Sequence, residues 1–314
     1  MFEIRKYTCD DKAAWDSFVD GSRQGTFLFR RDYVGYHSDR FEDFSLMVYR
    51  GGRLFALLPA SVDGDTLWSH QGLTYGGWIT NERATVGDMM DVFSLANREL
   101  KGLGINRVVY KPMPWIYQRQ PSEEDLYALT QVCDAKIMVR NVSSTISLRH
   151  PVKMRYGRRY DGNKAEANGV VIRKDNGALA GFWKVLEGNL WNAHNARPVH
   201  SLAEMERLMC LFPNNIELYV AEWQGQIVGG TVVFVTPQVV HTQYISASET
   251  GKKVHALDLL FRVVLEDYAD WLYFDFGTSN EDYGRVLNRG LIFQKEGFGG
   301  RAVCYDWYEY NINV

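Results

Sequence analysis

The fold of this chain is decided by residues 216–246, which read IELYVAEWQGQIVGGTVVFVTPQVVHTQYIS. Apolar and β-branched residues run through 216–222, 227–235 and 239–246, and the short turns QGQ and TPQ separate these runs. Runs of this length bounded by turn residues are typical of strands joined by hairpins. The stretch therefore predicts three consecutive antiparallel strands.

A helix and a further strand follow these three strands. Residues 254–268 carry Leu257, Leu260 and Val264 at helical spacing, and 271–276 (WLYFDF) is typical of a buried strand. We expect this last strand to return parallel to the third strand of the meander. The order of elements is thus three antiparallel strands, a helix and a returning strand.

The first half of the chain repeats this order. Roughly 170 positions earlier, the pattern predicts strands at 44–49, 54–61 and 66–70, a helix at 85–103 and a strand at 107–111. Internal duplication is the most economical explanation of two such series. The predicted fold class is α/β (α+β), with two tandem domains, each a mixed and largely antiparallel sheet flanked by helices.

The length of the chain agrees with two domains. Its 314 residues are too many for one ordinary domain and suffice for two of about 150 residues each. We place the boundary near residue 150, which gives domains at 1–150 and 151–314. Two helices, expected at 181–191 and 202–211, open the second domain.

Composition excludes several classes of protein. The formal net charge of −3 is not that of a protein that coats nucleic acid. The four cysteines have no CxxC spacing, which argues against a zinc site and against a disulfide framework. No apolar run reaches the roughly 20 residues that a membrane helix needs, and the first residues lack the pattern of a signal peptide. We therefore expect a cytoplasmic protein without a membrane span.

Several short motifs resemble a known superfamily. Residues 292–298, IFQKEGF, are similar to the closing motif of the GNAT acyltransferases, and two such domains in tandem resemble the Fem-type aminoacyl transferases and the FemAB-like or BioF2-like acetyltransferases. The second half of the chain carries the more specific motifs. These are Arg158-Arg159, NARPVH at 195–200, HTQY at 241–244, DFGTSNE at 275–281 and LNRGL at 287–291.

The resemblance implies an acyltransferase that moves an acyl group from acetyl-CoA or another acyl-CoA to an amine. The acceptor is then a small molecule or a cell-wall precursor. Two alternatives stay open: aminoacyl transfer from charged tRNA to a cell-wall precursor, and a non-catalytic ligand-binding protein of the GNAT fold. A nucleic-acid partner is expected only under the tRNA alternative, which the absence of a long coiled-coil arm weakens. The sequence does not indicate an oligomeric state.

The resemblance also indicates where the coenzyme binds. Superfamily members hold its pyrophosphate with a Q/R-x-x-G-x-G/A loop, and this chain has SETGKKVHA at 248–256 in that place. Free N–H groups at a helix start attract phosphate, and the lysines add positive charge. An ordinary solvated helix cap is the alternative. The candidate cofactor-binding residues are Ser248, Gly251, Lys252, Lys253, His255 and Ala256.

Amide formation needs a base for the amine and an acid for the leaving thiolate. Asp275 and Glu281 bracket the end of the returning strand and are the candidate bases, although Asp275 is also suited to capping the following loop. The tyrosine that often serves as the acid is replaced by Phe293, so Tyr244 and Tyr283 are the candidate acids. Packing is the alternative role for a tyrosine on a strand.

Further polar residues are candidates for acceptor binding. His241 and Tyr244 stand three apart on one strand, so regular alternation predicts that they face opposite sides of the sheet, with Gln243 on the side of His241. For Arg158 and Arg159 the alternative is a solvated linker face. For His194 and His200 the alternative is a hydrogen-bonded histidine in a loop. No cysteine or carboxylate stands at ligand spacing, so no metal is expected. The candidate substrate-binding residues are Arg158, Arg159, His194, His200, His241 and Gln243.

The N-terminal copy lacks the lysines that the C-terminal copy carries in the loop at 248–256. Its third strand is followed by Tyr75-Gly76-Gly77-Trp78, where the second copy has residues 247–249. We interpret the first domain as a degenerate copy that serves as a scaffold and as one wall of the acceptor cleft.

Overall fold

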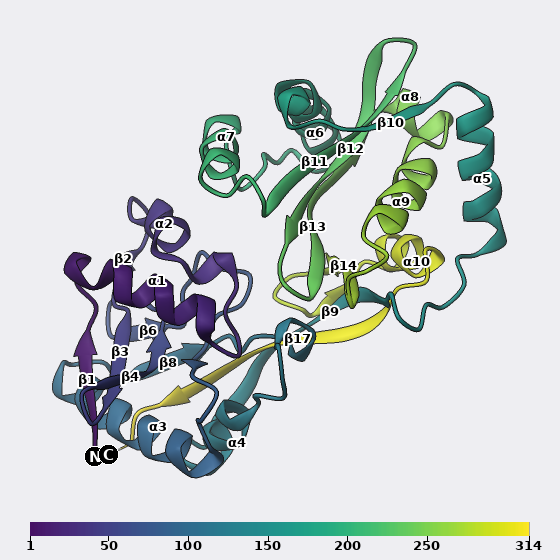
Figure 1. Cartoon of the computed structure of the whole chain (residues 1–314). Coiled ribbons are helices and arrows are strands. Elements are labelled where there is room, and N and C mark those ends of the chain that lie inside the picture. Colours follow the sequence, from purple (N-terminus) through teal and green to yellow (C-terminus); the bar gives the residue numbers. More distant parts are fainter. Residues whose placement is uncertain (314) are drawn as a thin grey trace. The chain divides into compact units, whose positions relative to one another are not determined.

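The computed structural model describes residues 1–313, apart from the side chains of Ala193 and His194. The chain forms two compact units of mixed α/β structure, drawn in Figure 1. Unit 1 comprises Met1–Val142, Asn280–Val286 and the residues from Cys304 onward, and unit 2 comprises Ser143–Ser279 and Leu287–Val303. The predicted fold class, two tandem domains with mixed sheets and flanking helices, is confirmed.

The two units are not separated by a single boundary near residue 150, because each is made of more than one segment of the chain. Strand β9 (Lys136–Ser147) leaves unit 1 at Val142 and continues in unit 2, and strand β17 (Arg301–Asn311) passes back into unit 1 at Cys304. A long strand has no linker at which a sharp boundary would form. Most of the last strand of the chain therefore belongs to the first unit, and only its first residues belong to the second.

Unit 2 is built on one mixed sheet. Its strand order is β10-β11-β12-β13-β14-β9, and every neighbouring pair is antiparallel except β13 and β14, which are parallel. The three predicted antiparallel strands and the parallel returning strand are therefore present. Besides β9, the bounds are β10 Val171–Lys174, β11 Ile216–Trp223, β12 Gln226–Val235, β13 Val239–Ala247 and β14 Tyr273–Thr278.

Helices cover both faces of this sheet (Figure 1). On one face α9 buries Leu260, Phe261 and Val264 against Phe274 and Phe276. On the other face α6 packs over β12 and β13. The helices of unit 2 are α5 Tyr156–Ala167, α6 Leu179–His194, α7 Leu202–Leu211, α8 Glu249–Lys253, α9 Ala256–Asp267 and α10 Arg289–Gly297.

A β-bulge in β13 corrects the expected side-chain alternation. Tyr244 pairs with Val232 and Thr242 pairs with Val233, so Gln243 is an extra residue in the strand. An extra residue reverses the alternation beyond it. His241 and Tyr244 consequently lie on the same face of the sheet, the one that α6 covers. The prediction that they face opposite sides is wrong, because no glycine or proline marks the bulge in the sequence.

Unit 1 repeats the arrangement in a divided form. Its strands form one sheet in the order β1-β3-β4-β7 and a series β17-β8-β6-β5-β2, in which β6 and β8 are parallel, as β13 and β14 are in unit 2. The bounds are β1 Phe2–Lys6, β2 Glu42–Asp43, β3 Leu46–Arg50, β4 Arg53–Leu58, β5 Ser61–Asp63, β6 Thr66–Trp68, β7 Ile79–Thr80, β8 Arg107–Tyr110, α1 Lys12–Gly21, α2 Arg31–Val34, α3 Val86–Gly102 and α4 Glu124–Gln131. Strands β15 (Asn280–Glu281) and β16 (Val286–Leu287) form a short two-stranded sheet.

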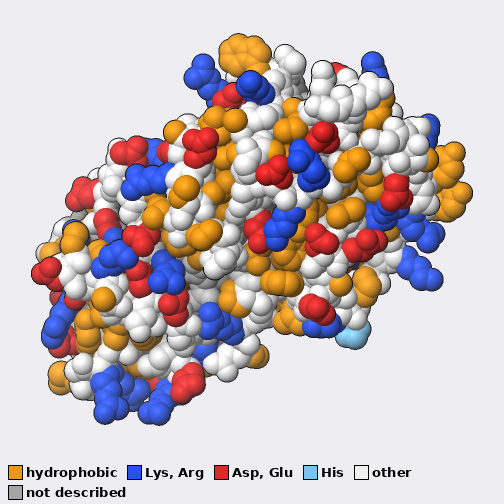
Figure 2. All heavy atoms as spheres, turned by 45° about the horizontal axis from the view of Figure 1, so that its top comes forward, with side chains coloured by type: hydrophobic (Ala, Val, Ile, Leu, Met, Phe, Trp, Pro, Cys, Tyr) orange, Lys and Arg blue, Asp and Glu red, His pale blue; other side chains and the backbone are white. Residues whose placement is uncertain are grey.

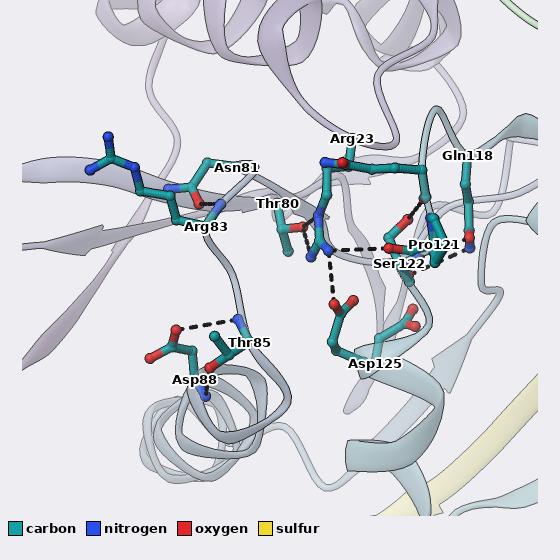
Figure 3. A network of polar contacts seen from close by, with 12 residues as sticks. Arg23, Thr80, Asn81, Arg83, Thr85, Asp88, Gln118, Pro121, Ser122 and Asp125 are labelled. Atoms are coloured by element: carbon teal, nitrogen blue, oxygen red, sulfur yellow. Dashed lines mark hydrogen bonds and ion pairs between the residues drawn. The ribbon is translucent and has the colours of Figure 1, made fainter.

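A buried arginine joins three segments of unit 1. The guanidinium of Arg23, just after α1, donates to Thr80 Oγ1 at 2.9 Å and to the carbonyl of Pro121 at 3.3 Å, and it pairs with Glu124 at 2.8 Å (Figure 3). Buried charges persist when they are paired and hydrogen-bonded in this way. Arg23 is therefore a structural residue that ties α1, β7 and α4 together.

Among the described residues, no helix combines the length and the apolar character that crossing a membrane requires.

Candidate functional site

The parallel strands β13 and β14 meet at a buried polar pair. Their register runs over only three residue pairs in the described structure and ends with His241 opposite Asp275. Asp275 is fully buried, and its Oδ2 lies 2.9 Å from Nδ1 of His241. Two hydroxyls from the neighbouring strand β9, those of Ser143 and Thr145, donate to its other oxygen, Oδ1. The carboxyl group is thus held by three side chains at the point where the two strands separate.

The imidazole of His241 lies against a glycine. A Cβ built on Gly277 would come within 3.2 Å of Cε1 and 3.8 Å of Nε2 of His241, so the absence of a side chain there leaves room for this edge of the ring. Gly277 also has a positive φ of 73°, a conformation that side chains disfavour. The local structure therefore explains two residues of the DFG motif at 275–277. Asp275 binds His241, and Gly277 leaves space for its ring.

A buried lysine lies beyond Asp275. Lys295, on α10, donates from Nζ to the carbonyl oxygens of Gly277 at 2.8 Å and Thr278 at 2.7 Å. Burial lowers the pKa of Lys295 to about 8, although the charge of Asp275 opposes this shift. Lys295 belongs to the IFQKEGF motif that carried the family resemblance, but its position in that motif does not reveal its partners.

Tyr244 and His200 form a second polar pair on the α6 face. The hydroxyl of Tyr244 lies 2.6 Å from Nδ1 of His200 and accepts the backbone N–H of the same residue at 3.1 Å. The ring of Trp183, on α6, meets that of Tyr244 edge to face. Burial raises the pKa of Tyr244, so its hydroxyl stays protonated at neutral pH. The side chain of His194, also proposed from the sequence, lies outside the described residues.

The loop after β13 folds into the short helix α8. Ser248 is its N-cap residue and accepts the N–H of Gly251 at 3.1 Å. A Cβ on Gly251 would lie 2.1 Å from the carbonyl oxygen of Val228, so only glycine fits at this position. The side chain of Lys252 binds Glu249 at 2.7 Å and Asn189 of α6 at 3.2 Å.

A pocket of about 520 Å³ opens between α6 and the start of α8. Its volume is in the range of small-molecule and cofactor sites. Three of the lining residues, Ser248, Glu249 and Lys252, come from the loop that the sequence proposed as the phosphate site. The α6 residues were not predicted, because their spacing is helical but the sequence does not say which face the helix turns to α8. They are Lys184, Val185, Gly188, Asn189 and Asn192.

The remaining loop residues lie outside this pocket lining. Lys253 is exposed, and Ala256 is completely buried in a small apolar cluster. His255 has a left-handed backbone, and its ring nitrogen lies 3.7 Å from Asp161 and 3.9 Å from Asp258. These three side chains could hold a metal ion by their spacing, but Asp258 already pairs with Arg158 at 2.8 Å.

Two of the proposed chemical residues belong to unit 1. Glu281 is exposed on β15, and Tyr283 is 69% exposed with its ring edge toward Trp307. Asp275 and Tyr244 belong to unit 2, so the four residues do not form one group within a unit. Of the proposed acceptor residues, Arg159 is exposed on α5.

Unit 1 has a different pair near the ends of its parallel strands β6 and β8. His70 is buried, and burial together with the nearby His37 and Lys111 lowers its pKa to about 3. Lys111 is also buried and donates to the carbonyls of Gln71 and Leu73. The two units therefore differ at this position: His70 lies near the lysine Lys111, whereas His241 binds the carboxylate of Asp275.

Sequence comparison identifies the family. Residues 152–285 match a family model described as an acetyltransferase (GNAT) domain, and this segment contains β13, β14, α8 and the pocket. Residues 152–285 therefore form a domain of the GNAT superfamily. No curated protein matches it by sequence.

Solved structures extend the likeness in fold to the full length of the chain. FemX matches with a TM-score of 0.70 and 10% identity over 98% of this chain and 97% of FemX. L-PGS from Bacillus licheniformis matches with a TM-score of 0.63 and 13% identity over 99% of this chain and 94% of its own. A tandem GNAT protein from the clavulanic acid biosynthesis pathway matches with a TM-score of 0.55 and 13% identity over 100% and 99%. At such identities the likeness shows the fold alone.

Proposed function

We propose that the protein transfers an acyl group from acetyl-CoA or another acyl-CoA to an amine acceptor. The observation that carries this proposal is the pocket at the C-terminal end of β13, the strand whose pairing with β14 ends at His241, within the segment that matches the GNAT family. Beyond His241 the described register of the two strands ends, so an extended molecule with amide groups can pair with the edge of β13. The pantetheine arm of coenzyme A is such a molecule.

The pocket supplies groups for the other end of the donor. Lys184 and Lys252 place two positive charges in it, and Asn189 and Asn192 offer amide donors. Charge-assisted hydrogen bonds of this kind are the strong contacts of phosphate sites. We assign the phosphates of the donor to the α6 side of α8, with Ser248, Gly251, Lys253, His255 and Ala256 shaping the loop around Lys252.

The base and the acid of the reaction are the residues proposed from the sequence. Asp275 or Glu281 assists loss of the amine proton, and Tyr244 or Tyr283 protonates the leaving thiolate. Unit 2 supports Asp275 and Tyr244 most directly, because both lie on the sheet that borders the pocket and Tyr244 stays protonated. The acceptor is a small-molecule amine or a cell-wall precursor, bound on the α6 face by Gln243, His241 and His200. Arg158 and Arg159, also proposed from the sequence, lie on α5, which packs against α9 on the other face. The first unit serves as a scaffold.

The test is a calorimetric titration with coenzyme A and acetyl-CoA, followed by an assay of thiol release with a panel of amines. Binding with thiol release supports the proposal. Binding without thiol release from any donor and amine indicates a protein of this fold that binds ligand without catalysis. No binding contradicts the donor site.

A surface on α5 favours aminoacyl-tRNA as a second candidate donor. Tyr156 and Tyr160 are exposed and stacked with their ring centroids 6.2 Å apart, and Lys153, Arg159 and Lys164 are exposed around them. Aromatic and cationic side chains together suit nucleic acid. On the face shown in Figure 2, however, Lys and Arg side chains are interspersed with Asp and Glu, which is not a broad basic surface. Binding of tRNA that falls steeply with salt would support this donor.

A further inference from the structure

Asp275, one of the two bases proposed above, cannot itself touch an amine. Its side chain has no exposed surface, and its two oxygens are occupied by Ser143, Thr145 and His241. A general base must come within hydrogen-bond reach of the proton that it removes. Any action of Asp275 on a substrate must therefore pass through one of its partners.

Of these partners, only His241 carries a group that serves as a general base in proteins, since the other two are hydroxyls. The two hydroxyls of β9 donate to Oδ1, so Oδ2 is left to accept from the imidazole. A carboxylate accepts and does not donate, which places the hydrogen of a neutral imidazole on Nδ1 and the lone pair on Nε2. The carboxylate thus fixes both the orientation and the tautomer of His241.

The side chain of His241 is mostly but not completely buried. The side chain of His241 keeps 12% of its surface exposed, and the ring edge that contains Nε2 lies over Gly277. The pair also stands at the last paired position of β13 and β14, beside the edge that the proposed donor occupies. The bulge at Gln243 places His241 on the same face of the sheet as Tyr244.

We propose that His241 is the general base of the amide-forming step and that Asp275 is its positioning residue. This rests on the acyl transfer proposed above. The neutral amine attacks the thioester carbonyl carbon, a C–N bond forms, the C–S bond breaks, and Nε2 of His241 takes the proton that the amine nitrogen loses. The departing thiolate gains one proton, and the imidazolium returns its own to this group or to water, so the products are an amide and a thiol.

Other titratable groups face this pair from the neighbouring elements. Lys295 on α10 places its ammonium beside Asp275, and Tyr244 on β13 binds His200 from the segment before α7. Lys295 competes with His241 for the charge of Asp275, but its amine is already committed to the carbonyls of Gly277 and Thr278. His241 is therefore the partner that can release and take a proton while the carboxylate stays in place.

The first measurement needs no activity. Nitrogen-15 NMR of the full chain reports which ring nitrogen of neutral His241 carries hydrogen, and assignment uses His241→Gln. We expect the Nδ1–H tautomer in the wild type and a shift toward Nε2–H in Asp275→Ala, the more common form of a free imidazole. An Nε2–H tautomer in the folded wild type would overturn the proposal, because Nε2 would then carry no lone pair.

The second measurement is the pH profile of kcat/KM with acetyl-CoA and an amine. A positioned base contributes about 10²–10⁴-fold, so His241→Gln should lose that factor together with the acidic limb of the profile. Imidazole in the buffer should restore part of the rate in His241→Ala. The exposed His150 gives the matched control, and His150→Gln should keep the wild-type profile.

The outcomes separate the two proposals. Wild-type turnover that persists within roughly threefold in folded His241→Gln contradicts the base role and leaves acyl transfer intact. Wild-type protein that releases no thiol with any acyl-CoA and amine contradicts acyl transfer, and the base role falls with it. A loss of rate in Asp275→Asn with an unchanged melting temperature supports positioning.

Discussion

The hydroxyl of Tyr244 lies 2.6 Å from Nδ1 of His200 and accepts the N–H of that residue at 3.1 Å. The contact ties the segment before α7 to the central strand β13. Directly after it, Ser201 and Glu204 form the capping box that begins α7. One phenol thus holds a loop and the start of a helix against the sheet.

Replacing Tyr244 by Phe should therefore cost stability. The N–H of His200 loses its acceptor in a buried place, and a polar group left in this way costs about 1–3 kcal/mol of the free energy of unfolding. Chemical denaturation measures the change. Tyr283→Phe is the matched control, because Tyr283 is 69% exposed, and it should be nearly neutral. Equal stability of the two variants would contradict the anchoring role.

The rate of the folded Tyr244→Phe protein tests the second role of this residue. If the hydroxyl also protonates the leaving thiolate, turnover should fall by about 10²–10⁴-fold, the usual contribution of a positioned acid. A rate within a few-fold of wild type would assign Tyr244 to anchoring alone.

Donor binding should depend on Lys252 more than on Lys253. Lys252 lines the pocket between α6 and α8, whereas Lys253 lies outside its lining. Loss of a charge-assisted contact to phosphate should weaken binding of coenzyme A by about 1–3 kcal/mol in Lys252→Ala. Calorimetry on Lys253→Ala provides the control, for which we expect a small effect. The reverse order of effects would move the phosphates away from this pocket.

Gly251→Ala should destabilise the loop that forms the pocket. The added Cβ would lie 2.1 Å from the carbonyl oxygen of Val228, so α8 must shift. Overpacking of a buried site costs about 1–3 kcal/mol, and coenzyme binding should weaken with it. Gly157, at the start of α5, has open space at the same place, and Gly157→Ala should not lower stability. A Gly251→Ala protein with wild-type stability and binding would show that α8 is not held in this way.

The stability of the protein should rise with pH through Lys111. Burial lowers the pKa of Lys111 from 10.5 to about 7, so between these values the unfolded chain binds a proton that the folded chain has released. The free energy of unfolding then increases with pH across this window, by at most about 1.4 kcal/mol per pH unit. This contribution is lost as the pH falls to 7.

The comparison is with Lys111→Met, which removes the titrating group. The wild type should gain stability over this variant as the pH rises from 7 to 9, measured by chemical denaturation at each pH. A constant difference between the two proteins would mean that Lys111 stays charged in the fold, stabilised by the carbonyls of Gln71 and Leu73 and by the ring of Trp307.

The sequence predicts the strands of the meander well because each is a run of apolar residues bounded by turn residues. Residues 216–246 give three strands within about a residue of their observed ends, and the parallel return of β14 follows from the helix between them. The meeting of His241 and Asp275 is harder to foresee. Both residues were proposed for function, but the bulge at Gln243 decides which way His241 faces.

The rest of the site depends on contacts between distant segments. Ser143 and Thr145 stand two apart on β9, a spacing that places them on one face, yet nothing local says that β14 is the neighbouring strand. The same holds for the pocket. Its α6 residues have helical spacing, and only the packing of α6 against β12 and β13 turns them toward α8.

The most direct test of acyl transfer is a mass-spectrometric assay of the purified full chain with acetyl-CoA and a panel of amines, read together with thiol release. The account predicts amine-dependent release of coenzyme A, an acceptor heavier by one acetyl group, and a loss of both signals in His241→Gln but not in His150→Gln. Bound coenzyme A without any acylated acceptor from a broad panel of acyl-CoAs and amines would contradict it.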